Sequence, residues 1–289
     1  MMRYNYCRPA SVKEACELLN KYQVEAKVIA GGTDLLVQVR DEDKKLADMK
    51  AVIDISQINE LRYIQEEDNI IRIGAIVTHD QIYNSPMLKT AVPFLSEACN
   101  TVGSLQIRHR GTIGGSICNA SPAADPVPAL IALNAEVKLE SVRGVRVVPM
   151  VDIFERPYKT NLAADELLTE ISFNRLPKGA KTAFVKLGRR KALAIARMNV
   201  AVVLTLDEEG IITEARIAPG SVLPKPGRVK SAEAILVGQK PTAGLIDSAA
   251  KKVAEAMVEK SGIRWSTPYK EPVIVVLTRR ALNAALEVE

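Results

Sequence analysis

The sequence contains few of the residues from which many functional sites are built. Aromatic side chains make up only 4% of its 289 residues, so we expect no extended stacking surface for single-stranded nucleic acid. Two histidines and four cysteines are too few ligands for a zinc or di-iron site held by this chain alone. We therefore expect neither a metal site nor a nucleic-acid partner.

The cysteines Cys7, Cys16, Cys99 and Cys118 are dispersed along the chain, and no two are separated by only two residues. Iron–sulfur clusters normally need four thiolates at short spacings, so we expect none here. The first ten residues lack the apolar stretch of a signal peptide, and no run of about 18 apolar residues predicts a membrane span. These features predict a cytoplasmic protein whose thiols are mostly buried as small apolar groups.

The remaining composition is that of a globular protein with one basic segment. The sequence is 47% hydrophobic and 25% charged, and its length predicts about two domains. Residues 175–197 contain eight Lys or Arg and no Asp or Glu, whereas acids slightly outnumber bases elsewhere. This segment indicates a local anionic ligand, a protein partner or a solvated strand edge protected by lysine. RNA or nucleotide binding is a further alternative, which the scarcity of aromatic residues disfavours.

The first part of the chain is predicted to begin as a β-α-β unit. Ser11 and Glu14 match a capping box ahead of a helix of two to three turns, with strands at 27–30 and 51–55. Residues 103–128 are rich in Gly, Ser, Asn, Ala and Pro, which predicts a functional loop without helices or strands. The other elements expected before residue 150 are strands at 61–65, 70–77, 135–139 and 145–148 and helices at 80–83 and 92–102.

The last third of the chain is predicted to be a separate α+β unit, with a boundary near Pro177. We expect domains at 1–176, with lobes at about 1–58 and 59–176, and at 177–289. The elements expected in the last part of the chain, beginning just before this boundary, are strands at 168–173, 183–187, 200–206 and 211–217 and helices at 231–236, 242–260 and 272–286.

A first candidate site lies at Gly31 and Gly32, directly after the predicted strand 27–30. Glycines there allow the backbone to approach a ligand, and successive free N–H groups can bind an anion such as a diphosphate. Thr33 adds a hydroxyl donor. The alternative is a tight strand-to-helix turn capped by Thr33 or Asp34. The motif has neither the lysine of a Walker loop nor G-x-G-x-x-G spacing, which disfavours both of those sites.

A second candidate site covers residues 111–126. Gly114 and Gly115 again expose the backbone, and small hydroxyl and amide side chains surround them. Asp125 is a lone acid that could accept a hydrogen bond from a sugar hydroxyl or a ring N–H. The alternative is an Ω-loop held by its own Ser and Asn side chains. Two such loops, about 80 residues apart, suggest a long phosphorylated ligand.

Together these motifs resemble the FAD-binding subunit of the molybdenum hydroxylases, a family that includes xanthine, carbon monoxide and nicotinate dehydrogenases. The resemblance spans essentially the whole chain. The segments that carry it are Tyr6–Ser11, Ala30–Leu35, Gly74-Ala75 with Thr78, Gly111–Ser116, Ala120–Asp125, Leu187–Arg190 and the last helix after Arg264.

The resemblance implies an α+β fold, with a two-lobed FAD-binding domain of the vanillyl-alcohol-oxidase type followed by a small α+β C-terminal domain. It implies an electron-transfer subunit that accepts electrons from [2Fe–2S] centres on one partner and passes them to NAD⁺ or another acceptor. The molybdenum cofactor would lie on a third chain of a heterotrimer. No catalytic residue is expected here, and His79 and His109 are expected at the surface. The alternative is a free-standing FAD-dependent oxidase or reductase of the same fold.

The resemblance also implies which residues contact FAD. Residues 28–35 would wrap the pyrophosphate, Asp125 would bind a hydroxyl or ring nitrogen, and Lys186 would place positive charge near the reduced flavin. The full set is Val28, Ile29, Ala30, Gly31, Gly32, Thr33, Asp34, Leu35, Val102, Gly111, Thr112, Gly114, Gly115, Ser116, Asn119, Asp125, Leu168 and Lys186.

Overall fold

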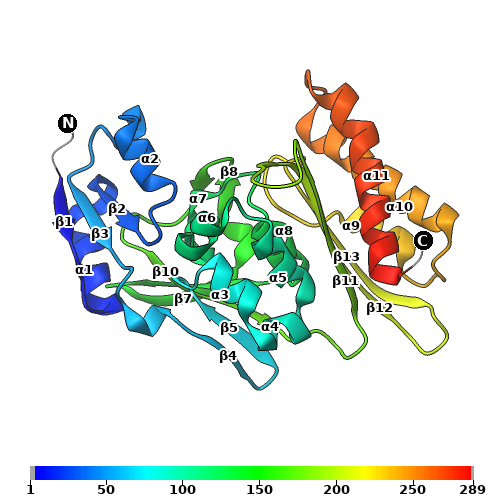
Figure 1. Cartoon of the computed structure of the whole chain (residues 1–289), viewed down its shortest axis with the longest axis horizontal. Coiled ribbons are helices and arrows are strands. Elements are labelled where there is room, and N and C mark those ends of the chain that lie inside the picture. The colour runs from blue at the N-terminus through cyan, green and yellow to red at the C-terminus, as the bar shows by residue number, and fades with distance from the viewer. Residues whose placement is uncertain (1–3, 288–289) are drawn as a thin grey trace. The chain divides into compact units, whose positions relative to one another are not determined.

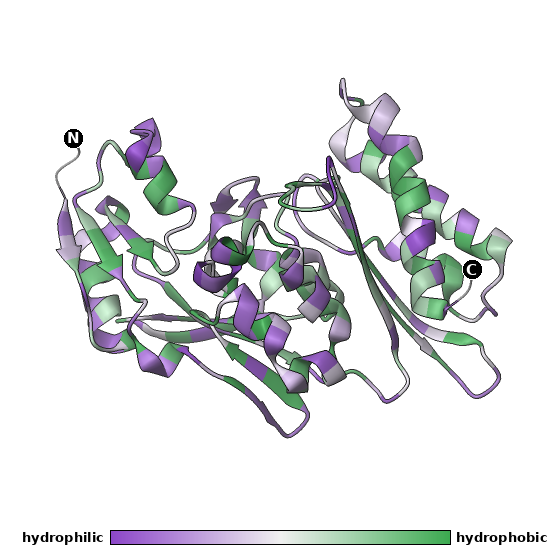
Figure 2. Ribbon diagram, viewed as in Figure 1, coloured by the Kyte–Doolittle hydropathy of each residue, from purple (hydrophilic) through white to green (hydrophobic). Residues whose placement is uncertain are grey.

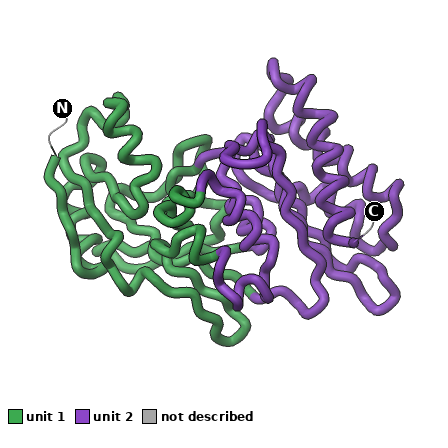
Figure 3. Tube along the Cα trace, in the orientation of Figure 1, with its two compact units in different colours: residues 1–82, 105–120, 135–174 green, residues 83–104, 121–134, 175–289 purple. Residues whose placement is uncertain are grey.

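The computed structural model describes residues 4–287, and these form two compact units that are each discontinuous in sequence (Figure 3). Unit 1 comprises the residues up to 82 together with 105–120 and 135–174. Unit 2 comprises residues 83–104, 121–134 and those from 175 onward. Both units contain helices and strands, which confirms the predicted α+β class (Figure 1). Within the described residues, no helix is both long and apolar enough to cross a bilayer.

The first sheet of unit 1 forms from the predicted β-α-β opening. Helix α1 (Val12–Tyr22) begins with the expected capping box, in which Ser11 Oγ accepts from the Glu14 N–H at 3.2 Å and Glu14 Oε2 accepts from the Ala10 N–H at 2.7 Å. The helix buries Leu19 against the sheet. The parallel strands lie in the order β1-β3-β2 and are β1 (Asn5–Cys7), β2 (Ala26–Ile29) and β3 (Ala51–Asp54).

The second sheet of unit 1 is antiparallel, with the order β4-β5-β10-β6-β7. Its central strand pairs Ile171 with Ile73 on one side and with Val137 on the other, and all three side chains are fully buried. The first strand begins later than predicted because residues Asn59–Leu61 form a 3₁₀ turn. The strands are β4 (Ile64–Glu67), β5 (Ile70–Gly74), β6 (Glu136–Ser141), β7 (Gly144–Pro149) and β10 (Leu167–Asn174).

The prediction of a loop without helices at 103–128 is wrong, because this segment contains short helices. In α7 (Ile113–Asn119), the fully buried Ile113 and Ile117 are four residues apart, and Thr112 caps the N-terminus. Glycine and serine between these two isoleucines concealed the helical spacing. The other short helices are α2 (Leu35–Arg40), α3 (His79–Asn84), α4 (Pro86–Ala91), α5 (Pro93–Asn100), α6 (Leu105–Arg110) and α8 (Pro126–Ala132).

Unit 2 is built around a three-stranded antiparallel sheet in the order β11-β12-β13. The central strand is buried on both faces, because α11 packs against it on one side and α8 on the other. Hydrophobic and hydrophilic residues alternate along α10 and α11, as expected for helices with one buried face (Figure 2). The elements are β11 (Lys181–Gly188), β12 (Ala196–Leu206), β13 (Ile212–Gly220), α9 (Lys230–Leu236), α10 (Ala243–Ser261) and α11 (Thr267–Leu286).

Helix α11 begins earlier than predicted, at Thr267 rather than at Pro272. A proline inside a helix removes one backbone hydrogen bond, which is why residue 272 was expected to mark the start. The helix nevertheless continues through Pro272, because the side chains of Ile274, Leu277 and Ala281, which follow the proline, are buried in the core of unit 2. The remaining elements are the small hairpin β8 (Phe154–Arg156) and β9 (Lys159–Thr160) and the 3₁₀ turns Gln23–Glu25, Lys44–Leu46 and Met150–Ile153.

Candidate functional site

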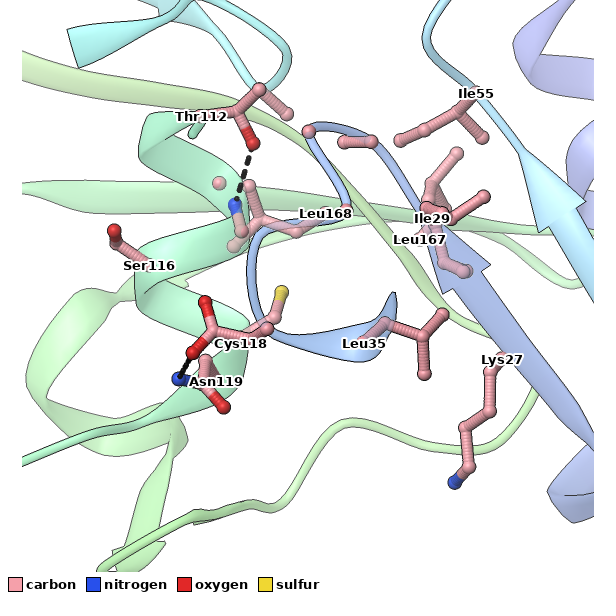
Figure 4. Close-up of a pocket in the computed structure, with 18 of the residues that line it drawn as sticks. Lys27, Ile29, Leu35, Ile55, Thr112, Ser116, Cys118, Asn119, Leu167 and Leu168 are labelled. Carbon is pink, nitrogen blue, oxygen red and sulfur yellow. Dashed lines mark hydrogen bonds between the residues drawn. The ribbon is translucent and has the colours of Figure 1, made fainter. Parts of the chain in front are cut away.

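The two glycine-rich segments that lie about 80 residues apart in the sequence come together in unit 1. Gly31 packs so closely against the Arg110 carbonyl oxygen that a Cβ atom at residue 31 would overlap it. Asn119 Nδ2 donates to Asp34 Oδ1 at 3.1 Å and joins the segments a second time. Between them lies a cavity of about 380 Å³. Figure 4 shows Thr112, Ser116 and Asn119 on one side of it and residues of β2 and the following loop on the other.

The first loop, residues 30–34, presents a row of unused backbone donors. The N–H groups of Gly31, Gly32, Thr33 and Asp34 have no hydrogen-bond partner among residues 4–287. Gly32 adopts a left-handed φ of 75°, which a residue without a side chain adopts at little cost. Successive unpaired N–H groups in such a turn form a concave site for an anion. All four of these residues line the cavity.

The second loop, residues 111–116, offers hydroxyl groups rather than backbone donors. The N–H groups of Ile113 and Gly114 donate to Val77 and Ala75 carbonyl oxygens at 2.9 and 3.0 Å. Those of Gly115 and Ser116 donate to Thr112. The expectation that Gly114 and Gly115 expose their backbone to a ligand is therefore wrong for their N–H groups, because the segment forms the capped helix α7. The Thr112 and Ser116 side chains remain as donors at the cavity wall.

The second loop packs against the Gly74-Ala75 motif at the end of β5. A Cβ on Gly114 would lie 2.7 Å from the Ala75 carbonyl oxygen, so α7 can approach the end of β5 only with a glycine at that position. Thr78 forms an isolated antiparallel bridge with Thr112 a few residues further on. The turn after β5 therefore fixes the position of the helix that carries Ser116.

His79 is buried, with 1% of its surface exposed, so the expectation of a surface histidine is wrong for this residue. Its ring Nε2 lies 3.0 Å from Ser116 Oγ, and its Nδ1 has no partner among the described residues. Burial and the neighbouring Arg108 lower the pKa of His79 to about 4, so the ring is neutral at pH 7. His109 does lie at the surface, where its Nδ1 is 3.3 Å from Asp80.

Comparison with known proteins identifies the family. The sequence model described as "FAD binding domain in molybdopterin dehydrogenase" matches residues 2–176, and "CO dehydrogenase flavoprotein C-terminal domain" matches residues 183–285. The nicotinate dehydrogenase FAD-subunit of Eubacterium barkeri is 36% identical over 94% of this chain and 92% of its own length. The chain belongs to the FAD-binding subunits of the molybdenum hydroxylases. It is thus a flavoprotein component of an oxidoreductase family.

Other members of the molybdenum hydroxylase family agree in sequence and in structure. The carbon monoxide dehydrogenase medium chain of Hydrogenophaga pseudoflava is 33% identical over 98% of this chain and 97% of its own length. A solved structure of carbon monoxide dehydrogenase from the same organism superimposes with a TM-score of 0.92, covering 99% of this chain and 98% of that one. Quinoline 2-oxidoreductase from Pseudomonas putida 86 gives a TM-score of 0.90 at 28% identity, covering 99% and 98%.

The groups that line the cavity in unit 1 are suited to the pyrophosphate part of FAD. A pyrophosphate needs hydrogen-bond donors and little steric hindrance, which unpaired N–H groups, hydroxyls and glycines all provide. Every residue predicted from the resemblance lines the cavity except Val102, Asp125 and Lys186. Sequence reasoning missed Ala75 and Cys118, which also line it. Ala75 was indicated by the Gly74-Ala75 motif, whereas nothing in the sequence distinguished Cys118.

Asp125, Lys186 and Asn199 form a buried polar cluster in unit 2. Lys186 Nζ lies 2.5 Å from Asp125 Oδ2 and donates to the Thr101 carbonyl oxygen at 2.8 Å. Asn199 Nδ2 donates to Asp125 Oδ1 at 3.0 Å. Burial raises the pKa of Asp125, while Lys186 and Asn199 oppose that shift. The charge of Lys186 is thus paired, and the cofactor contacts expected for Val102, Asp125 and Lys186 stay predictions.

The close approach of the two loops predicts the effect of Gly31→Ala. The added methyl group would push the first loop away from the Arg110 carbonyl oxygen and displace the row of N–H donors. We expect the FAD dissociation constant to rise at least tenfold, a loss of about 1.4 kcal/mol, so that the purified variant contains less FAD than the wild type. Gly244→Ala is the control, since a Cβ there meets no atom within 4 Å. Equal FAD content in both variants would contradict the prediction.

The buried neutral ring of His79 predicts a pH-dependent contribution to stability. Its folded-state pKa of about 4 lies below the ordinary value of 6.5, so between these values the unfolded chain binds the proton and the folded chain does not. The free energy of unfolding should therefore fall as the pH is lowered from 6.5 to 4, by up to about 3 kcal/mol from this group. Urea titrations of wild type and His79→Gln should diverge over this range. Parallel curves would show that His79 makes no such contribution.

Proposed function

We propose that this chain is the electron-transfer subunit of a three-subunit molybdenum hydroxylase. FAD held by the residues of the unit 1 cavity would supply two-electron redox chemistry, so that the chain could accept electrons from a [2Fe–2S] centre on one partner and pass them to NAD⁺ or another acceptor. Substrate oxidation would take place at a molybdenum cofactor on the third subunit. The role of this chain is to bind the dinucleotide, orient it and present it to the partner.

The observation that carries the proposal is the row of four unpaired N–H groups at Gly31–Asp34 beside the hydroxyls of Thr112 and Ser116. A pyrophosphate carries two negative charges and accepts hydrogen bonds along its whole length. Donors converging from two sides of a cavity match that pattern. Lys27 is the single basic side chain among the described residues that line this cavity, so backbone and hydroxyl donors make up most of the recognition.

The same cavity supports electron transfer over a free-standing oxidase. An oxidase or reductase that acts on its own substrate needs an acid or base close to the flavin. Among the described residues that line the cavity, the carboxylate of Asp34 is the single acidic group, and Asn119 already donates to it. His79 lies behind Ser116, where its buried neutral ring is not suited to proton transfer with a substrate. A flavoprotein that only relays electrons needs none of these groups.

The electron acceptor can be identified by testing the reverse reaction, in which a reduced nucleotide gives electrons to the FAD. Under anaerobic conditions, NADH added to the FAD-loaded chain should bleach the visible flavin band within seconds if NAD⁺ is the natural acceptor. NADPH serves as the matched control, because it differs from NADH by one phosphate. Bleaching by a chemical reductant but by neither nucleotide would mean that electrons leave to a different acceptor. A chain that binds no FAD, alone or co-expressed with its partners, would overturn the proposed function itself.

A second cavity, of about 780 Å³ in unit 2, supports docking of the iron–sulfur partner. It is lined by Arg189, Arg190, Arg197 and Lys270, and no acidic side chain lies among the described residues of its wall. Trp265 at its rim is 93% exposed. Burial, Arg264 and Arg197 lower the pKa of Lys270, as expected where cations crowd together without acids. Exposed tryptophan with arginine is typical of protein interfaces and here favours an acidic partner surface.

Charge reversal tests this docking surface. We expect Arg189→Glu/Arg190→Glu to abolish co-purification of the iron–sulfur partner at physiological salt, while the chain keeps its FAD. Lys44→Glu/Lys45→Glu is the matched control, because it makes the same change in net charge at two exposed lysines of unit 1. Intact assembly and internal electron transfer in the arginine variant would refute this use of the surface.

We also propose that the protein works in the reducing cytoplasm. All four cysteines are free thiols, and Cys16 and Cys99 are buried. Burial raises the pKa of Cys16 to about 11, which disfavours the reactive thiolate. Dispersed thiols that serve as small apolar groups in the core support a compartment in which disulfides do not form.

A further inference from the structure

His79 has no role in the proposed relay of electrons, yet it is one of the most enclosed polar groups in unit 1. Its backbone N–H donates to the Gly111 carbonyl oxygen at 3.0 Å, and its ring Cδ2 lies 3.2 Å from the position of a Cβ on Gly111. The ring therefore packs directly behind the second loop. Among the described residues, its ring forms a single hydrogen bond, to the Oγ atom of Ser116, and Ser116 lines the cavity.

The tautomer of the His79 ring follows from its surroundings. A neutral imidazole carries one hydrogen, on either Nδ1 or Nε2. Nδ1 is buried without a partner, and a buried N–H without an acceptor is rarer in proteins than an unsatisfied acceptor atom. The hydrogen is therefore better placed on Nε2, where it can be donated to Ser116 Oγ at 3.0 Å.

This tautomer determines what Ser116 can do. When its Oγ accepts from the imidazole, its own hydroxyl hydrogen cannot be used in that contact. No acceptor for this hydrogen is present among the described residues. The N–H groups of Gly111 and of residues 113–116 in the second loop are used within the protein, so hydroxyls are the main donors that this loop keeps for a ligand. The Ser116 hydroxyl hydrogen can therefore rotate, and its direction decides whether Ser116 donates into the cavity.

We propose that His79 is a positioning residue of the FAD site: its Nε2–H donates to Ser116 Oγ and so directs the Ser116 hydroxyl hydrogen into the cavity, toward a phosphate oxygen. This inference rests on the proposed binding of FAD in that cavity. Arg108, which faces the ring, disfavours a second positive charge there. The imidazole thus stays a neutral donor, and the Ser116 hydroxyl cannot turn back toward it.

Nitrogen NMR tests the tautomer without any mutation of the site. The chain has only two histidines, so His109→Gln leaves His79 as the single ¹⁵N-histidine signal. We expect the shifts of a neutral ring protonated on Nε2, unchanged between pH 5.5 and 8 and in the presence or absence of FAD. A ring protonated on Nδ1, or one that titrates near pH 6.5, would overturn the proposal even if every variant folded poorly.

Binding of FAD to paired variants tests the consequence. In His79→Gln the side-chain amide can reach the place of Nε2 and still donate, whereas in His79→Asn the amide is too short to reach Ser116. We expect the FAD dissociation constant to rise about tenfold in His79→Asn and in Ser116→Ala, and less than about threefold in His79→Gln. His109→Asn is the control at the exposed histidine and should bind like wild type.

A double-mutant cycle separates positioning from a structural role. If His79 acts through Ser116, His79→Asn/Ser116→Ala should bind FAD no more weakly than either single variant. Additive losses would mean that His79 only supports the packing of the loop and would overturn the proposal. Wild-type chain that binds no FAD would instead contradict the proposed function. The two failures are thus distinguishable, since the NMR result on His79 does not depend on FAD.

Discussion

The contact between Gly31 and the Arg110 carbonyl oxygen is the constraint on which the cavity in unit 1 depends. It leaves no room for a Cβ atom, so the loop after β2 and the segment after α6 can line one cavity from opposite sides. A side chain at residue 31 would move the two loops apart and with them the donors on the two sides of the cavity. The hydrogen bond from Asn119 to Asp34 then holds the pair in register from the other end. The positions of the donors on both sides of the cavity depend on this close approach of the two loops.

The two loops contribute different kinds of donor, and the difference has a structural cause. The first loop is a short connection in which the N–H groups of residues 31–34 have no partner within residues 4–287. The second folds into α7, and the N–H groups of residues 113–116 are satisfied by Thr112 and by the turn after β5. Rigid backbone donors therefore face orientable hydroxyl donors across the cavity. Such a combination can adapt to the bent shape of a pyrophosphate while keeping most of its donors fixed in advance.

Much of this arrangement could be predicted from the sequence, and the exceptions have physical reasons. Capping by Ser11, the strand before Gly31 and the strands of unit 2 follow from local patterns, and the structure confirms them. The helix α7 was missed because its apolar spacing has only two members, Ile113 and Ile117, in a glycine-rich segment. Burial of His79 was missed because it depends on Gly111, a partner about 30 residues away. Contacts of that kind carry no periodic signal.

The order of strands in the second sheet of unit 1 has a consequence for how the chain is made. Strand β10 lies between β5 and β6 but follows both of them in the sequence. During synthesis the hairpins β4-β5 and β6-β7 emerge first, each with an open edge of unpaired backbone groups, and the central strand arrives last. Open edges of this kind are sites of aggregation. A chain that ends before residue 167 would therefore leave the inner edges of β5 and β6 unpaired in addition to the outer edges of β4 and β7.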